Sequence, residues 1–264
     1  MYDSHIHSEF SADCKTPLAD IVQSAIQKGI KTITITDHID YLYLGGDSFE
    51  FDPQSYDKTL KEYQFNYRNE IEILKGLELG LQPHVLEMCK QLVSKETFDF
   101  IIASVHGCQK EDFYFGNFFD DKTPQEAMEI YLDELYVMIM EFKCFNVLGH
   151  IDLPKRYNAD VAKLDPASLM SRYEKIFKLL ISRGQGIELN TSGLRQDVGV
   201  QFPDKSIIEL YYDLGGRIIT LGSDSHTADS LTSGFEEAIE LLKSIGYEAI
   251  CTFKDGKVRY HRFD

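Results

Sequence analysis

The sequence predicts an α/β protein built as a seven-stranded (β/α) barrel, and three observations lead to this fold class. Short apolar runs alternate with longer amphipathic segments, which is typical of parallel strands joined by right-handed helical crossovers. Histidines and carboxylates recur where the apolar runs end. These polar residues follow at least six of the apolar runs. An open sheet brings together the ends of only a few strands at one switch point, whereas a closed ring brings all of its strand ends to one mouth.

The predicted strands are seven apolar runs, at residues 2–7, 31–37, 71–79, 98–105, 145–151, 186–190 and 217–223. The helices between them have marked starts, because an N-cap residue precedes a proline in four places: Thr16-Pro17, Asp52-Pro53, Thr123-Pro124 and Asp165-Pro166. Glu126 completes a capping box with Thr123.

Two further elements follow from local patterns. Within the segment 124–142, apolar residues at helical spacing predict a stripe that faces the core, formed by Ala127, Ile130, Tyr131, Leu135 and Met138. The last stretch, 249–263, predicts a hairpin about Asp255-Gly256 that covers an edge or the floor of the barrel.

Length and composition fit one globular domain that spans residues 1–264, with 43% apolar and 27% charged residues. The net charge of −16 argues against a nucleic-acid partner and an anionic membrane surface. No apolar run is long enough to span a bilayer, and no signal peptide is expected. The five cysteines form no CxxC pair, so we expect reduced, mostly buried thiols and a cytoplasmic protein.

Possible metal ligands gather at the ends of the predicted strands. The histidines there are His5, His7, His38, His106, His150 and His226, and the carboxylates are Asp3, Asp13, Asp37, Glu78, Asp152 and Asp224. Residues two apart on a strand point to the same face, which makes His5/His7, His150/Asp152 and Asp224/His226 natural pairs of ligands. One such histidine would be ordinary, but the whole set predicts a multi-metal hydrolytic site. His84 and His261 stand apart from it.

Four motifs together resemble the PHP (polymerase and histidinol phosphatase) superfamily: HxH at 5–7, TDH at 36–38, GHxD at 149–152 and GSDSH at 222–226. The resemblance covers essentially the whole chain, and the length is similar to that of the histidinol-phosphate phosphatase family of amino-acid biosynthesis. It implies a distorted, TIM-like barrel of seven strands with three divalent metal ions. It also implies hydrolysis of L-histidinol phosphate to L-histidinol and inorganic phosphate, in histidine biosynthesis.

The same resemblance implies the ligands of each ion. The first ion would be held by His5, His7, Glu78 and Asp224, the second by Glu78, His106 and His150, and the third by Asp13, His38 and His226. Glu78 can bridge two ions because a carboxylate has two oxygens. Mixed nitrogen and oxygen ligands suit zinc, manganese and iron alike, so the native metal stays open.

Three of the strand-end acids have no place in this scheme. Asp152 is expected to orient His150 or a neighbouring imidazole. Asp37 and Asp3 are expected to cap a helix or to make hydrogen bonds within loops.

Hydrolysis of a phosphate monoester needs a nucleophile, cancellation of phosphoryl charge and help for the leaving alkoxide. A metal-bound hydroxide would attack phosphorus, because coordination to zinc can lower the pKa of water to about 7. Arg156 and Arg195 follow the fifth and sixth strands and are predicted to bind phosphate through their guanidinium groups. Asp224 or His226 is predicted to protonate the leaving group, and the sequence does not decide between them.

Two connections are longer than a barrel requires, at residues 40–52 and 107–122. The second contains FYFGNFF, at 113–119, which either packs locally or forms a lid or wall over a flat substrate group. Acids in these loops could receive the ammonium and imidazole groups of histidinol phosphate, the candidates being Asp40, Glu111 and Asp112.

Other functions stay open at this stage. A PHP-type phosphoesterase could act on a nucleotide, a phosphodiester or phosphotyrosine, although a polynucleotide exonuclease should show a basic track, which this chain lacks. A metal-dependent amidohydrolase and a non-catalytic metal-binding module are the remaining alternatives. The oligomeric state is not indicated by the sequence.

Overall fold

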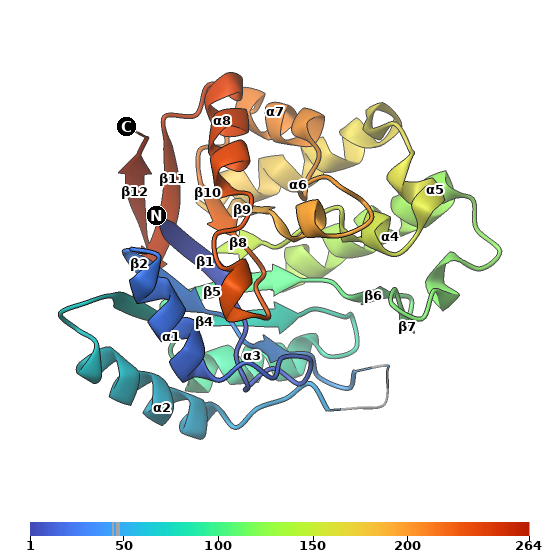
Figure 1. Cartoon of the computed structure of the whole chain (residues 1–264). Coiled ribbons are helices and arrows are strands. Elements are labelled where there is room, and N and C mark those ends of the chain that lie inside the picture. The colour runs from blue at the N-terminus through green and yellow to red at the C-terminus, as the bar shows by residue number, and fades with distance from the viewer. Residues whose placement is uncertain (44, 46–47, 264) are drawn as a thin grey trace.

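The computed structural model describes residues 1–43, 45 and 48–263, and its centre is a nearly closed barrel of parallel strands (Figure 1). The strands pair in the order β1-β2-β4-β5-β8-β9-β10, and the short β3 pairs with β4. Their bounds are β1 (Tyr2–Ile6), β2 (Thr32–Ile35), β3 (His38–Ile39), β4 (Glu72–Gly80), β5 (Phe100–Ser104), β8 (Val147–Leu148), β9 (Gly186–Asn190) and β10 (Ile219–Gly222). Each of the seven predicted runs contains one strand of the ring, so the predicted barrel is confirmed.

The ring closes between its first and last strands only at the C-terminal mouth. There the N–H of His7 donates to the carbonyl of Ser225 at 2.9 Å, and the N–H of Asp224 donates to the carbonyl of His5 at 2.8 Å. These two bonds place the turn after β10 directly against the end of β1. They therefore bring together the HxH motif at 5–7 and the GSDSH motif at 222–226.

The C-terminal hairpin fills the other end of this gap, as predicted. Its strands are β11 (Ala249–Lys254) and β12 (Lys257–Arg262), and its turn has positive φ at both Asp255 and Gly256. The ring of His261 stacks on that of Tyr2 with centroids 3.7 Å apart. Phe253 packs with Phe100 of β5 in a small apolar cluster. The hairpin thus covers both the edge beside β1 and the floor of the barrel.

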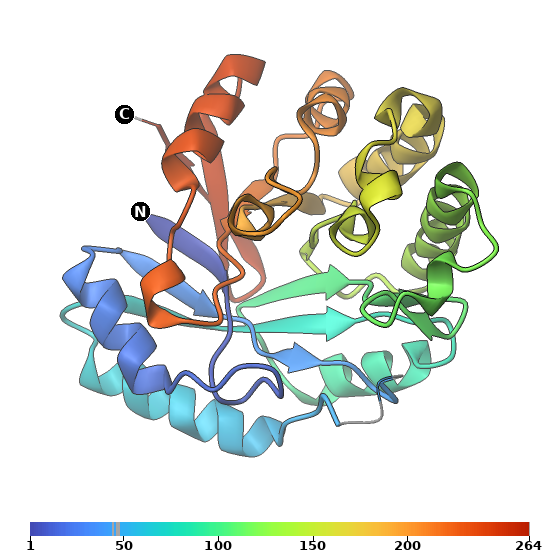
Figure 2. The same ribbon diagram turned by 45° about the vertical axis from the view of Figure 1, so that its right-hand side comes forward.

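The helices lie around the outside of the strands (Figure 2). They are α1 (Leu18–Gln27), α2 (Pro53–Asn66), α3 (Leu86–Lys95), α4 (Pro124–Glu141), α5 (Ala159–Ala162), α6 (Met170–Ser182), α7 (Lys205–Asp213) and α8 (Phe235–Ile245). Short 3-10 segments are η1 (Asn117–Phe119), η2 (Leu153–Arg156), η3 (Pro166–Leu169), η4 (Ser192–Arg195) and η5 (Ala228–Ser230). A two-stranded ribbon, β6 (Gly107–Cys108) with β7 (Glu111–Asp112), follows β5.

Three of the four predicted N-caps are confirmed. Asp52 accepts hydrogen bonds from the first turn of α2, and Thr123 forms a capping box with Glu126 at the start of α4. Asp165 caps the 3-10 segment η3, which runs directly into α6.

The predicted cap at Thr16 is wrong, because α1 begins one residue later than expected and Pro17 occupies the N-cap. The carboxylate of Glu9 accepts the hydrogen bond from the N–H of Leu18 instead. The hydroxyl of Thr16 donates to the carbonyl of His226 at 2.7 Å. A contact with a distant loop has therefore replaced the local cap.

The core and the cysteines follow the sequence pattern closely. In α4, Ala127, Tyr131, Leu135 and Met138 are buried as predicted, and Ile130 is half-buried. All five cysteines are free, and only Cys144 is exposed. Within the residues that the structure describes, no helix combines the length and apolarity needed to cross a membrane.

Candidate metal centre

Glu78 occupies the centre of a ligand cluster at the C-terminal mouth of the barrel. It lies near the end of β4, is fully buried, and directs each carboxylate oxygen towards different imidazoles. Oε2 lies 3.0 Å from Nε2 of His5, 3.3 Å from Nε2 of His7 and 3.0 Å from Nδ1 of His38. Oε1 lies 2.9 Å from Nε2 of His150 and 3.3 Å from Nε2 of His106. This is the arrangement that a bridging carboxylate requires.

The first two predicted ligand sets come together in space. Nε2 of His5 lies 3.0 Å from Nε2 of His7, and Oδ1 of Asp224 lies 3.3 Å from the same His7 nitrogen. Asp224 reaches this position with a left-handed backbone, φ 51°, which costs a non-glycine residue about 1 kcal/mol or more. In the second set, one ligand atom each from Glu78, His106 and His150 lies within 4.8 Å of the others.

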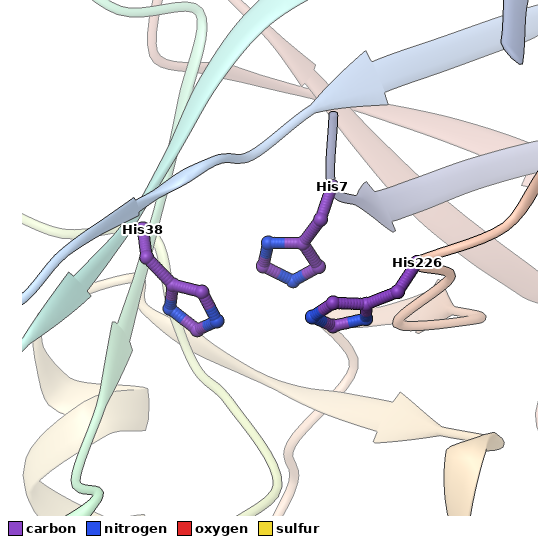
Figure 3. A group of neighbouring side chains, drawn as sticks. All are labelled: His7, His38 and His226. Atoms are coloured by element: carbon purple, nitrogen blue, oxygen red, sulfur yellow. The ribbon is translucent and has the colours of Figure 1, made fainter. Parts of the chain in front are cut away.

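The third predicted set lies at the open side of the cluster. Oδ2 of Asp13 is 3.1 Å from Nε2 of His226 and 3.7 Å from Nε2 of His38. His7 also adjoins this set, and the rings of His7, His38 and His226 converge on a shared space from three separate segments (Figure 3). All nine side chains predicted as ligands therefore lie in one cluster.

In the metal-free cluster, protons on the imidazoles of His38 and His5 offset the negative charge of the buried carboxylates. Burial alone would lower the pKa of His38, but Glu78, Asp40 and Asp13 outweigh it and raise that pKa to about 9. Burial likewise opposes the raised pKa of His5, which its three carboxylate neighbours hold well above the ordinary value. His7 differs, because burial and two neighbouring histidines lower its pKa to about 3.

The arrangement of nitrogen and oxygen atoms in the cluster fits bound divalent cations. Nδ1 of His38 lies 3.0 Å from Oε2 of Glu78, yet it has no hydrogen-bond partner, so both atoms face a common position instead of each other. Cations bound there would replace the imidazole protons and neutralise the buried carboxylates. The mixed nitrogen and oxygen donors suit zinc, manganese and iron.

Asp40 is part of this cluster and also lines the cavity over it, so its predicted contact with the substrate stays a prediction. It is buried, its Oδ1 lies 3.0 Å from Nδ1 of His106, and its Oδ2 lies 3.5 Å from Nδ1 of His38. The reason is that β3 pairs with β4 and carries Asp40 inward over Gly80. A Cβ at Gly80 would lie 1.7 Å from Oδ1 of Asp40, so only glycine leaves room for this carboxylate.

Sequence reasoning missed Glu188, a fully enclosed carboxylate on β9. Its Oε1 lies 2.6 Å from Nδ1 of His5, and its Oε2 accepts a hydrogen bond from the N–H of His150 at 3.0 Å. One indication was available: an acid inside the buried apolar run GIELN must face the barrel interior or be paired there.

The remaining strand-end acids have structural roles. Asp152 was expected to orient an imidazole, and this is wrong: its Oδ2 binds Nζ of Lys155 at 2.6 Å and the N–H of Asp204 at 3.0 Å. Asp37 accepts hydrogen bonds from Ser8 and Ser11, and Asp3 accepts them from Ser223 and Thr232, among others. These loop hydrogen bonds are as predicted.

The two predicted phosphate-binding arginines are placed differently. Arg156 lines the cavity over the cluster, and its Nη2 lies 3.2 Å from Oδ2 of Asp224, while its buried Nε has no partner. Arg195 donates to the carbonyl of Ser223 at 2.6 Å and so supports the turn after β10. The position of Arg156 favours phosphate binding, whereas the same role for Arg195 stays a prediction.

A cavity of about 380 Å³ opens over the cluster. Its lining combines residues predicted as metal ligands and Arg156 with five aromatic side chains, which are Tyr43, Phe49, Tyr114, Phe115 and Tyr157. Asp112 also lines it and is buried, whereas Glu111 is half-buried outside it and lies 3.9 Å from Lys122.

The aromatic loop at 113–119 combines both roles considered for it. Phe113 and Phe118 are fully buried and pack against the core. Tyr114 and Phe115 are 71% and 55% exposed and form part of the cavity wall. In the other long connection, 40–52, residues 44, 46 and 47 lie outside the described residues.

A ring of parallel strands whose mouth gathers imidazoles around a buried carboxylate defines the class of barrel metalloproteins. Over residues 3–192 the sequence matches the PHP domain, and the chain belongs to this metal-dependent family. The family predicted from the four motifs is thereby confirmed.

Proteins similar to this chain match it over nearly its whole length. The "Probable histidinol-phosphatase" of Thermotoga maritima is 32% identical over 258 residues, which cover 97% of this chain and 97% of that protein. The histidinol-phosphatase of Lactococcus lactis is 31% identical and covers 97% and 95%. A crystal structure of the Lactococcus lactis histidinol phosphate phosphatase, complexed with zinc, L-histidinol and phosphate, has a TM-score of 0.90, 30% identity and 98% coverage of both chains.

Proposed function

We propose that this chain is a metal-dependent histidinol-phosphatase, which hydrolyses L-histidinol phosphate to L-histidinol and inorganic phosphate. The observation that carries the proposal is the cavity over the ligand cluster, which Arg156, five aromatic side chains and Asp112 line together. The histidinol-phosphatase of Lactococcus lactis is similar to the chain over nearly all of its length, and its crystal structure is a complex with zinc, L-histidinol and phosphate. The five free cysteines suit a cytoplasmic location.

The ligand cluster and Arg156 form the phosphate-binding part of the cavity. Divalent cations, when bound to this cluster, would activate a water molecule and cancel phosphoryl charge. Arg156 lines this cavity and binds a phosphoryl oxygen through its guanidinium group, whose Nη2 is held by Asp224 and Ser192. Its guanidinium carbon lies 5.0 Å from the centre of the Phe202 ring, which limits the directions in which the guanidinium can point.

The leaving alkoxide needs a proton, for which Asp224 and His226 were the two candidates. Asp224 is an acceptor for Arg156, and its pKa lies well below the ordinary value, because His5, His7 and Arg156 outweigh its burial. It has no proton to give near neutral pH. His226 is the candidate that remains, and it lines the cavity at the open side of the cluster.

The aromatic side chains and Asp112 in the cavity lining accept the imidazole and ammonium groups of the substrate. Flat aromatic side chains offer stacking faces to the imidazole, and Tyr114 and Phe115 are exposed enough to close over it. Asp112 supplies the negative charge that an ammonium group needs, and its Oδ1 is fixed by the N–H of Tyr114 at 2.6 Å. A nucleotide, or a phosphotyrosine residue within a peptide, has no ammonium group to pair with this carboxylate.

Phosphate release from a panel of substrates tests the proposal. The metal-depleted protein is reloaded with Zn²⁺ or Mn²⁺ and offered L-histidinol phosphate, nucleoside monophosphates, a phosphotyrosine peptide and a bis-aryl phosphodiester. Release from L-histidinol phosphate alone, and its loss on chelation, would support the assignment. Faster turnover of any other substrate would replace it, and activity that survives complete removal of metal would exclude it.

A further inference from the structure

Glu188 has no role in the predicted ligand sets, although it is more deeply enclosed than several of the ligands. It lies on β9, the one strand of the mouth from which no ligand was predicted, and it is 1% exposed. A carboxylate buried to this degree is costly unless every oxygen is paired. The hydrogen-bond partners of Glu188 therefore indicate its role.

Each oxygen of Glu188 accepts from a different part of the cluster. Oε1 lies 2.6 Å from Nδ1 of His5. Oε2 accepts from the N–H of His150 at 3.0 Å and from Nδ2 of Asn190 at 3.1 Å. Nδ2 of Asn190 also lies 3.4 Å from Oδ2 of Asp224. One side chain thus joins ligands that come from β1, from the end of β8 and from the turn after β10.

Gly222, the last residue of β10, makes room for this carboxylate. A Cβ at Gly222 would lie 2.0 Å from Oε1 of Glu188 and 2.5 Å from Cβ of His5, closer than such atoms can approach. The backbone of β10 beside β9 is therefore shaped to admit Glu188 behind the ligands.

We propose that Glu188 is a positioning residue of the metal centre, which fixes the tautomer of His5 and the placement of His150. By accepting the Nδ1 proton of His5, it leaves Nε2 free to bind a cation beside His7 and Glu78. Its second oxygen holds the backbone of His150 at the distance where Nε2 meets Oε1 of Glu78. The inference rests on the metal centre of the proposed function, and it is independent of the substrate.

The chemistry of an amide predicts the effect of Glu188→Gln. The carboxylate accepts three hydrogen bonds, whereas a glutamine has one accepting oxygen and an NH₂ group that can only donate. If the NH₂ faces His5, it imposes the tautomer that carries the proton on Nε2 and cannot bind metal there. If the NH₂ faces the other side, it opposes the N–H of His150 and Nδ2 of Asn190. No orientation of the amide satisfies all three donors.

Metal affinity provides the test, and it requires no turnover of substrate. The binding of Zn²⁺ is titrated against competing chelators for wild type and for Glu188→Gln, with the fold checked by circular dichroism. Affinity for the tightest ion should fall about 10-fold to 100-fold in the variant. The matched control is Glu72→Gln, at the opposite end of β4, where the carboxylate pairs with Lys254 and Arg259. Wild-type affinity in folded Glu188→Gln would overturn the proposal.

A second measurement keeps the proposal testable if Glu188→Gln does not fold. In wild type loaded with Zn²⁺, the ¹⁵N shifts of the His5 ring, identified by their loss in His5→Ala, should show a proton on Nδ1 and zinc on Nε2. Zinc on Nδ1, or a proton on Nε2, would overturn the inference. A failure of the proposed function looks different, because L-histidinol phosphate would then be inert while the zinc affinity still depended on Glu188.

Discussion

The buried ion pair between Asp152 and Lys155 offers the sharpest test of how the loops at the barrel mouth are held. Lys155 is 5% exposed, and its Nζ binds Oδ2 of Asp152 at 2.6 Å, Oδ1 of Asp204 at 2.9 Å and the carbonyl of Gln201 at 3.0 Å. These bonds tie the loop after β8 to the loop that precedes α7. Arg156 is the next residue along the chain, so this tie also sets its position.

Replacing Lys155 with methionine keeps the length of the side chain and removes the charge. Asp152 would then be left buried and unpaired, an arrangement that typically costs about 3–5 kcal/mol of the free energy of unfolding. For a chain of this length the melting temperature should fall by roughly 2 °C per kcal/mol, or by about 6–10 °C. The double variant Asp152→Asn/Lys155→Met should lose less than the single variant, because no charge remains buried.

Urea denaturation of the three proteins with metal loaded would measure these differences, and steady-state kinetics would measure the effect on Arg156. The Michaelis constant for phosphate substrate should rise in Lys155→Met, because the loop that carries Arg156 loses its anchor. A loss of less than about 1 kcal/mol in Lys155→Met would show that the pair behaves as an exposed ion pair. The reasoning from burial would then be refuted.

Four further predictions concern the metal centre and the cavity. Glu78→Gln should lower turnover by several orders of magnitude and reduce bound metal, as measured by elemental analysis of folded protein. Arg156→Ala should raise the Michaelis constant at least about tenfold with metal content unchanged, and a larger effect from Arg195→Ala would reverse the order that their contacts suggest. Asp112→Asn should weaken binding of L-histidinol far more than binding of inorganic phosphate, as measured by product inhibition. In the metal-free protein, the pKa of His38 is about 9 when folded against 6.5 in the unfolded chain, a difference worth about 3 kcal/mol. This stabilisation is complete below pH 6.5 and is lost as pH rises through 9, so calorimetry should show a falling melting temperature over that range.

The barrel and the predicted ligands could be found from the sequence because both follow from the direction of the strands. Parallel strands place their C-terminal ends at one mouth, so a histidine or carboxylate at the end of a run can be assigned to that mouth from the sequence. Glu188 could not be found in this way. Its partner His5 is 183 residues away, and an acid inside an apolar run does not reveal which neighbour neutralises it.

The errors share a cause, which is competition between local and distant partners. Thr16 precedes a proline and a helix, but its hydroxyl bonds to the His226 loop instead of the helix end. Asp152 is two residues from His150, but a lysine one turn further on takes its carboxylate. Spacing along the chain shows which side chains can meet, and packing selects among them.

The seam between β1 and the turn after β10 has a consequence for biogenesis. The first predicted ion takes ligands from His5 and Asp224, which are separated by most of the polypeptide, so its binding place exists only after the last barrel strand has been synthesised. Nascent chains that lack this strand offer that ion only part of its ligand shell. Binding of this ion is then a late step of maturation that links β1 to the turn after β10. The free energy of ion binding offsets the chain entropy lost when these two segments are brought together.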